Sequence, residues 1–326
     1  MLPPGTSPQP RTRPAALLLA LVVAVTTVLT TGALSSASAA APAAAPAAGP
    51  AAGPAARANP GLPLPERCLV RPGKCEIGPQ KAGAPTLVLW GDSHAWQHLR
   101  GIQQATAAPR RHVNLVVFLY GGCPPMDQKL TPAQVRTAGP CAQTNHRALA
   151  YVQRLHRQQR PYRVLLGSGW EIFRYALSPL PDGAAGWRQP TSDSVANAAR
   201  LGRTGTPALF RTLGRMGAPV DVIGQMVTVP TNAPACAAGF NPYRCTLPRS
   251  AALAHFAENM RQIRQLRGML TRPSLLVQPS RLLCDTRRCR STMDGRSVYA
   301  NPAHITKPVA GRLQRYFAPT VGRLLG

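Results

Sequence analysis

Short runs of apolar residues alternate along the chain with longer segments whose apolar residues recur at helical spacing. The short runs predict buried β-strands, and the longer segments predict amphipathic helices. The predicted strands are Thr86–Trp90, Val113–Tyr120, Arg163–Leu166, Val220–Ile223 and Leu275–Val277. The predicted helices are Ala95–Ala107, Thr144–Gln159, Ser192–Met216, Ala251–Leu270 and Thr306–Leu325, with the third split near Gly202, Gly205 and Pro207.

Strands of this kind, apolar throughout and separated by helices, are typical of a parallel sheet covered on both faces. The pattern therefore predicts an α/β fold, a three-layer α/β/α sandwich around a parallel, flavodoxin-like sheet of about five strands. In such sheets, reactive groups collect at the carboxyl ends of the strands. That edge is where candidate chemistry is sought.

The N-terminal region lacks this alternation. Arg11 and Arg13 precede an apolar run from Ala15 to Leu34, and Ala37–Ala39 offers small residues for cleavage. This order is typical of a secretory signal. The run is also about 20 residues long, which is enough to cross a bilayer. Residues 1–39 are therefore interpreted as a signal peptide or a signal anchor, and the rest of the chain is expected to be extracytoplasmic, either secreted or membrane-anchored.

Residues 40–65 consist almost entirely of alanine, proline and glycine, with a single arginine before the last proline-rich stretch. They offer no periodic apolar face, so we interpret them as an extended linker. Residues 66–326 are long enough to form one large α/β domain.

All eight cysteines lie in residues 66–326. An even number of cysteines behind an export signal indicates disulfide bonds, and the spacings do not fit a zinc site. We predict that neighbours in sequence pair. The predicted bridges are Cys68–Cys75, Cys123–Cys141, Cys236–Cys245 and Cys284–Cys289.

The chain is strongly basic, with 38 Lys and Arg against 11 Asp and Glu and a formal net charge of +27. The arginines are spread through every segment and only 5% of the residues are aromatic, which argues against a nucleic-acid interface. We interpret the charge as a solvated surface attracted to anionic envelope polymers or lipid headgroups.

The segment Gly91–His94 lies between a predicted strand and a predicted helix. A serine there presents its hydroxyl at the carboxyl edge of the sheet, and the helix start favours developing negative charge. The alternative for Ser93 is an ordinary helix cap. A serine also needs a base, and His304 lies in a predicted loop before the last helix. The alternative for His304 is a loop histidine without chemistry.

Four segments in order resemble the SGNH hydrolase superfamily, and most closely the SGNH domain associated with membrane acyltransferases that modify cell-surface polysaccharides. They are Gly91–His94, Gly122–Pro125, Leu165–Trp170, and Cys284–Cys289 followed by Asn301–Thr306. The resemblance implies that Ser93 is the nucleophile and His304 the base. It also implies that the backbone amides of Ser93 and Gly122 form the oxyanion hole. Gly169 and Trp170 are expected at the substrate site, with Trp170 either stacking on a sugar or packing under the rim.

The chain departs from the superfamily pattern in two places. The usual oxyanion asparagine of the third block is absent, and Asn301 occupies the position of the acid that orients the histidine. An amide can hold the imidazole ring but cannot stabilise an imidazolium by charge. The sequence leaves open a slower Ser–His dyad, another carboxylate, or a degenerate binding domain. The other carboxylates considered are Asp294, Asp285 and Glu171, while Asp92 is expected to organise the serine turn.

The resemblance thus predicts extracytoplasmic acyl transfer, with acetyl as the expected group, to or from cell-envelope carbohydrate through an acyl-enzyme on Ser93. No metal or other cofactor is expected. A separate membrane acyltransferase is the expected partner for delivery of the acyl group. The alternatives are a stand-alone secreted esterase and a carbohydrate-binding domain without catalysis.

Overall fold

The computed structural model describes residues 68, 73–170, 193–227, 247–252, 256–301 and 304–326. The predicted signal segment and linker lie outside these residues, as does the predicted Cys236–Cys245 bridge. The central sheet has six strands: β1 (Cys75–Ile77), β2 (Thr86–Gly91), β3 (Asn114–Leu119), β4 (Tyr162–Gly167), β5 (Val220–Ile223) and β7 (Leu276–Val277). Within the described residues, no helix is long and apolar enough to cross a lipid bilayer.

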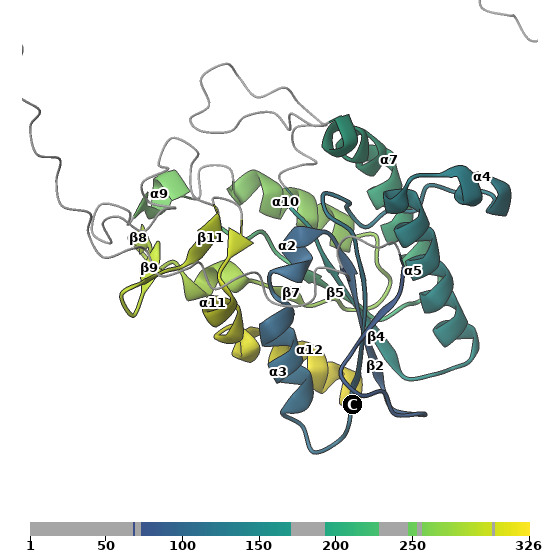
Figure 1. Ribbon diagram of the computed structural model, residues 1–326, viewed down its shortest axis with the longest axis horizontal. Helices are drawn as coiled ribbons and strands as arrows, with labels where there is room; N and C mark the ends of the chain where they lie inside the picture. The colour runs from purple at the N-terminus through teal and green to yellow at the C-terminus, as the bar shows by residue number, and fades with distance from the viewer. Residues whose placement is uncertain (1–67, 69–72, 171–192, 228–246, 253–255, 302–303) are drawn as a thin grey trace, which may run out of the picture. The chain divides into compact units, whose positions relative to one another are not determined.

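The strand order in this sheet is β1-β3-β2-β4-β5-β7. Figure 1 labels four of these strands, β2, β4, β5 and β7. Strands β3, β2, β4, β5 and β7 are parallel, which confirms the five strands predicted from the sequence. The short β1 was not predicted, and it pairs antiparallel with β3 at the edge. Strand β2 is central, and its last residue, Gly91, pairs in register with Gly167 on one side and Leu119 on the other.

Alternate side chains of each strand enter two separate cores, one on each face of the sheet. Leu87 and Leu89 of β2 join the core formed with α2 (Ser93–Trp96), α3 (Leu99–Ala107), α11 (Lys307–Gly311) and α12 (Gln314–Leu325). Val88 and Trp90 join the core formed with α5 (Pro140–Arg157), α7 (Asp193–Arg215) and α10 (Phe256–Arg267). The strands are buried on both faces, and the three-layer sandwich is confirmed.

The remaining elements are short. They are α4 (Pro132–Thr137), α9 (Arg249–Ala252), η1 (Pro279–Leu282), β6 (Leu247–Pro248), β8 (Arg288–Cys289), β9 (Thr292–Met293), β10 (Arg296–Ser297), β11 (Tyr299–Asn301) and β12 (His304–Ile305). Strand pairs β6–β8, β9–β10 and β11–β12 are antiparallel. Disulfides join Cys68 to Cys75, Cys123 to Cys141 and Cys284 to Cys289, as predicted.

Three helices differ from their predicted form. The predicted helix over residues 306–325 is two helices, α11 and α12, joined by a turn in which the Leu313 N–H bonds to the Ala310 carbonyl. The predicted helix over residues 95–107 is two helices, because the chain tightens into a turn where the His98 N–H bonds to the Ala95 carbonyl. The predicted break in the helix before Met216 is absent, and α7 continues through Pro207. Tertiary contacts support α7 there. The Gly205 carbonyl accepts the Asp127 N–H at 2.8 Å, and the Thr206 hydroxyl donates to the Pro125 carbonyl at 2.7 Å.

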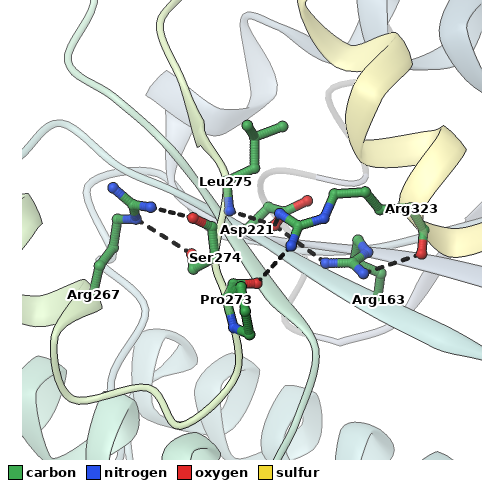
Figure 2. A network of polar contacts seen from close by, with 7 residues as sticks. All are labelled: Arg163, Asp221, Arg267, Pro273, Ser274, Leu275 and Arg323. Atoms are coloured by element: carbon green, nitrogen blue, oxygen red, sulfur yellow. Dashed lines mark hydrogen bonds and ion pairs between the residues drawn. The ribbon is translucent and has the colours of Figure 1, made fainter.

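A buried ionic network ties the far end of the sheet to the C-terminal helix (Figure 2). Asp221 of β5 is fully buried, and its Oδ1 lies 3.2 Å from Arg163 of β4 and 3.4 Å from Arg323 of α12. The same oxygen accepts the Leu275 N–H at 2.8 Å. Arg163, Asp221 and Leu275 lie near the amino ends of β4, β5 and β7. The network therefore holds the edge of the sheet opposite the serine turn.

Candidate active site

The serine turn begins where β2 ends. Gly91 has no room for a side chain, because a Cβ there would lie 1.8 Å from the Gly167 carbonyl oxygen. Asp92 follows as the N-cap of α2, and Ser93 is the first residue of that helix. The backbone N–H groups at a helix start are free to face an anion. The turn therefore lifts the partly exposed Ser93 to the carboxyl edge of the sheet, as the sequence predicted.

Asp92 organises this turn with a carboxylate that is fully buried. It accepts the His94 N–H at 2.8 Å, the Ser168 hydroxyl at 2.5 Å and the Gly169 N–H at 2.9 Å. Ser168 and Gly169 follow β4, so one carboxylate fastens the ends of two neighbouring strands. A carboxylate that accepts several donors is rigidly held. The segment that replaces the superfamily's asparagine block thus braces the serine turn.

His304 is brought to Ser93 by the β11–β12 pair. Its Nε2 lies 2.8 Å from the Ser93 Oγ, although the two residues are 211 positions apart in sequence. The sequence predicted a loop at this point, whereas His304 begins the short strand β12, in register with Asn301. A hydroxyl and an imidazole at this distance form the hydrogen bond that proton transfer requires.

The environment of His304 favours its neutral form. Burial, and then the nearby charge on His94, lower the pKa of His304 from 6.5 to about 3. The two imidazole rings lie with their centroids 4.9 Å apart and their planes inclined by 46°. Because a general base must be unprotonated to act, His304 is ready to accept a proton at neutral pH. The low pKa also makes it a weak proton acceptor.

The carboxylates considered as a replacement acid are engaged elsewhere or undescribed. Asp294 lies in the exposed turn between β9 and β10 and forms an ion pair with Arg312. Asp285 accepts two backbone N–H groups of its own disulfide loop, each at 2.8 Å. Glu171 lies outside the described residues.

Gly122 follows β3 and lies on the same edge of the sheet as Ser93, because β3 and β2 are adjacent and parallel. Its φ of 63° lies in the left-handed region that favours glycine. The loop that follows is held by Asn145 of α5, whose side chain accepts the Trp90 indole N–H at 2.7 Å and the Met126 N–H at 3.0 Å. This arrangement fixes the second predicted block against β2.

Trp170 belongs to the core that β2 forms with α5, α7 and α10. It is only 2% exposed, and its indole N–H donates to the Ile223 carbonyl at 2.7 Å. The same residue lines a pocket together with Thr206, Pro207 and Met269, so stacking on a sugar and packing both stay predictions for Trp170. Gly169 lies against His94, and a Cβ at Gly169 would come within 2.8 Å of the His94 ring.

Two residues of the site were missed by the sequence analysis. Asn145 is a polar residue on the apolar face of α5, and that position was the signal that could have found it. Gln97 is fully buried beside the turn after α2, and its side chain accepts the Ile305 N–H at 2.9 Å. Only the fold reveals this second contact, because the two residues are 208 positions apart.

No group of three or more His, Cys, Asp or Glu side chains in the described part of the chain is arranged to hold a metal ion. The rings of His94 and His304 lie with their centroids 4.9 Å apart, whereas the His98 ring centroid lies 5.9 Å from that of Phe317. His98 is 1% exposed, and burial and the charges on His94 and His304 lower its pKa to about 3.

Comparison with known proteins identifies a family and several structurally similar proteins. A family model described as "SGNH domain (fused to AT3 domains)" matches residues 63–319. No curated protein matches the chain. The chain is similar to the periplasmic domain of the lipopolysaccharide acetyltransferase of Salmonella ser. Paratyphi A, with 13% identity and a TM-score of 0.44. That match covers 74% of this chain and 85% of the other.

Proposed function

Because this chain belongs to the family of SGNH domains that are fused to AT3 domains, we propose that it transfers acyl groups to or from carbohydrate through Ser93. One observation carries the proposal: the 2.8 Å contact between the Ser93 Oγ and the His304 Nε2. The expected group is acetyl. The acceptor is a hydroxyl of cell-envelope carbohydrate, and a membrane acyltransferase is the expected partner that delivers the donor.

The first half of the reaction forms an acyl-enzyme. His304 Nε2 takes the Ser93 hydroxyl proton while Oγ attacks the carbonyl carbon of the donor ester. The negative charge on the carbonyl oxygen is stabilised by the backbone N–H groups of Ser93 and Gly122. The tetrahedral intermediate then collapses, the bond to the leaving oxygen breaks, and His304 returns the proton to that oxygen.

The second half releases the acyl group. A sugar hydroxyl enters, gives its proton to His304 and attacks the acyl carbon, and Ser93 regains the proton as the new ester leaves. Water in place of the sugar gives hydrolysis by the same steps. Asn301 stands where the superfamily has the acid that stabilises the imidazolium, so we expect slower turnover than in a complete triad.

The charge around the base supports an anionic acceptor. Five arginines in and near the Cys284–Cys289 loop are exposed: Arg281, Arg287, Arg288, Arg290 and Arg296. The nearby Asp285 and Asp294 are engaged by backbone N–H groups and by Arg312. Two backbone bonds of 2.8 Å, Val298 to Ser291 and Thr306 to Val298, connect this segment to the strand of the base. The short strands involved lie together in Figure 1.

The three disulfides support an extracytoplasmic location, because such bonds persist in oxidising compartments. This agrees with the proposal that residues 1–39 direct export and that residues 40–65 tether the domain.

Acetyl transfer tests the proposal directly. The purified chain would be given 4-nitrophenyl acetate, with and without an oligosaccharide acceptor that carries carboxylates. We expect release of nitrophenol that depends on Ser93 and acetylated oligosaccharide detected by mass spectrometry. Acetate alone would indicate an esterase. No release above the Ser93→Ala variant would indicate a binding domain and contradict the proposal.

A further inference from the structure

The base-bearing strand is attached to the serine helix through one buried amide. Gln97 is fully buried at the end of α2, and its Oε1 accepts the N–H of Ile305 at 2.9 Å. Ile305 follows His304 directly in β12. The other end of the amide, Nε2, lies 3.5 Å from Nδ1 of His94, at the outer limit of a hydrogen bond. The bond from Ile305 fixes which end of the amide faces which partner.

The His94 ring is the second part of the same arrangement. It is 8% exposed and packs against the His304 ring, with the centroids 4.9 Å apart. Its backbone N–H is held by Asp92, and its other side is closed by Gly169, where a Cβ would lie 2.8 Å from the ring. These contacts fix the position of the His94 ring, and the His304 imidazole packs against the side of the ring that faces away from Gly169.

We propose that Gln97 and His94 are positioning residues that hold the His304 ring against Ser93. This inference rests on the proposed function of Ser93 and His304. In a complete triad, a carboxylate fixes the orientation of the imidazole. Here Gln97 fixes the backbone beside the base and His94 limits the tilt of its ring. Neither residue touches the acyl group.

The groups around the base agree with a mechanical role. Burial is the larger cause that lowers the pKa of His304, and the charge on the neighbouring His94 is the second. Gln97 and His94 supply orientation and add no negative charge of their own. Displacing a reacting group by about 1 Å can slow a reaction roughly a hundredfold. A single amide that fixes the strand of the base is therefore expected to matter for rate.

Two Gln97 variants separate positioning from simple packing. Gln97→Ala removes both contacts, and we expect the rate constant for fluorophosphonate labelling of Ser93 to fall roughly ten- to a hundredfold. Gln97→Glu keeps an acceptor for the Ile305 N–H and adds negative charge near the rings. We expect it to retain more activity than the alanine variant and to move the acidic limb of the pH–rate profile to higher pH. A simple packing defect would lower the rates of the alanine and glutamate variants alike.

The matched control is Gln80→Ala. Its side-chain amide bonds to the carbonyls of Ile77, Gly78 and Leu115 at the opposite edge of the sheet. We expect the control to label at the wild-type rate. A Gln97→Ala variant within twofold of the control, with an unchanged pH profile, would overturn the inference.

Hydrogen exchange keeps the inference testable apart from catalysis. In Gln97→Ala, we expect the Ile305 amide to exchange at least tenfold faster, while the Thr306 amide, bonded to the Val298 carbonyl at 2.8 Å, changes little. If the wild-type chain is not labelled at all, the proposed function fails, and the exchange result still decides whether Gln97 holds the strand. Unchanged exchange at Ile305 would reject the positioning role.

Discussion

The Nε2 of His304 lies 2.8 Å from the Oγ of Ser93, and the two residues belong to opposite ends of the domain in sequence. Ser93 is placed by the end of the central strand β2, and His304 by a short antiparallel pair outside the main sheet. The contact therefore depends on two separately built elements. A second bond joins the same two regions, because the Gln97 side chain accepts the Ile305 N–H at 2.9 Å.

Restoring the acid is expected to speed the reaction. Asn301 pairs in register with His304 across the β11–β12 pair, at the position of the superfamily's acid. Asn301→Asp should raise the pKa of His304 and stabilise its imidazolium, because an opposite charge favours the protonated form. We expect the rate constant for acylation to rise about tenfold or more. Stopped-flow release of nitrophenol measures it, and a rate equal to or below wild type would contradict this reading of Asn301.

The buried histidines should make stability depend on pH. Burial, and then the charges on His94 and His304, lower the pKa of His98 from 6.5 to about 3. The folded state thus keeps His98 neutral while the unfolded chain protonates it below pH 6.5. The stabilising contribution is complete above pH 6.5 and is lost as the pH falls toward 3, at up to about 1.4 kcal/mol per pH unit.

The substitution His98→Leu should remove the part of the acid-induced loss of stability that comes from His98. Urea unfolding at several values between pH 7 and pH 4 should show a flatter decline in the free energy of unfolding for the variant than for wild type. His156→Leu is the control, since that ring lies on α5 and contacts the Tyr162 hydroxyl at 3.1 Å. Parallel curves for wild type and His98→Leu would show that His98 is protonated in the fold.

Asp221 is expected to be the most sensitive carboxylate for stability. It is fully buried between Arg163 and Arg323 (Figure 2), and removing its charge leaves guanidinium groups without their partner. Breaking a buried pair costs roughly 3–5 kcal/mol. We expect Asp221→Asn to lower the free energy of unfolding by an amount of that order, whereas Glu76→Gln at an exposed pair with Lys74 should change it little. If Asp221→Asn and Glu76→Gln lower the free energy of unfolding equally, the stabilising role of the buried Asp221 network is contradicted.

A methyl group at Gly169 should disturb the site without disturbing the core. The added Cβ would lie 2.8 Å from the His94 ring, which must then shift against His304. We expect Gly169→Ala to lower the labelling rate of Ser93 roughly tenfold or more while the melting temperature changes little. Gly121→Ala is the control, because nothing lies within 4 Å of a Cβ there. If both substitutions lower the labelling rate equally, the claim that the His94 ring positions His304 is contradicted.

The arginines near the base should favour anionic acceptors. Replacing Arg287, Arg288 and Arg290 with serine is expected to raise KM for a carboxylate-bearing oligosaccharide several-fold at low salt, with little change for a neutral one. A control triple at exposed arginines of α5 and α7 keeps the same net charge: Arg157→Ser, Arg203→Ser and Arg211→Ser. If the control raises KM as much, net charge and not this segment attracts the acceptor.

The strands and the Ser93–His304 pair could be predicted because local signals specify them. Apolar runs ending in glycine located β2 and β4 almost to the residue, and the order of four motifs pointed to the hydroxyl and the imidazole. The role of Gln97 could not be predicted, because its partner is 208 residues away and nothing local distinguishes it from a surface glutamine. The continuous α7 was missed because Gly205 and Thr206 are supported by the distant loop at 125–127.

Labelling of Ser93 by a fluorophosphonate tests the central claim most directly, because the reagent requires an activated serine. Peptide mapping after reaction should place the adduct on Ser93 in the wild-type chain and in His156→Ala. We expect labelling to vanish in Ser93→Ala and to fall at least a hundredfold in His304→Ala. An unlabelled wild-type chain, or labelling that persists unchanged without His304, would contradict the proposed Ser93–His304 chemistry.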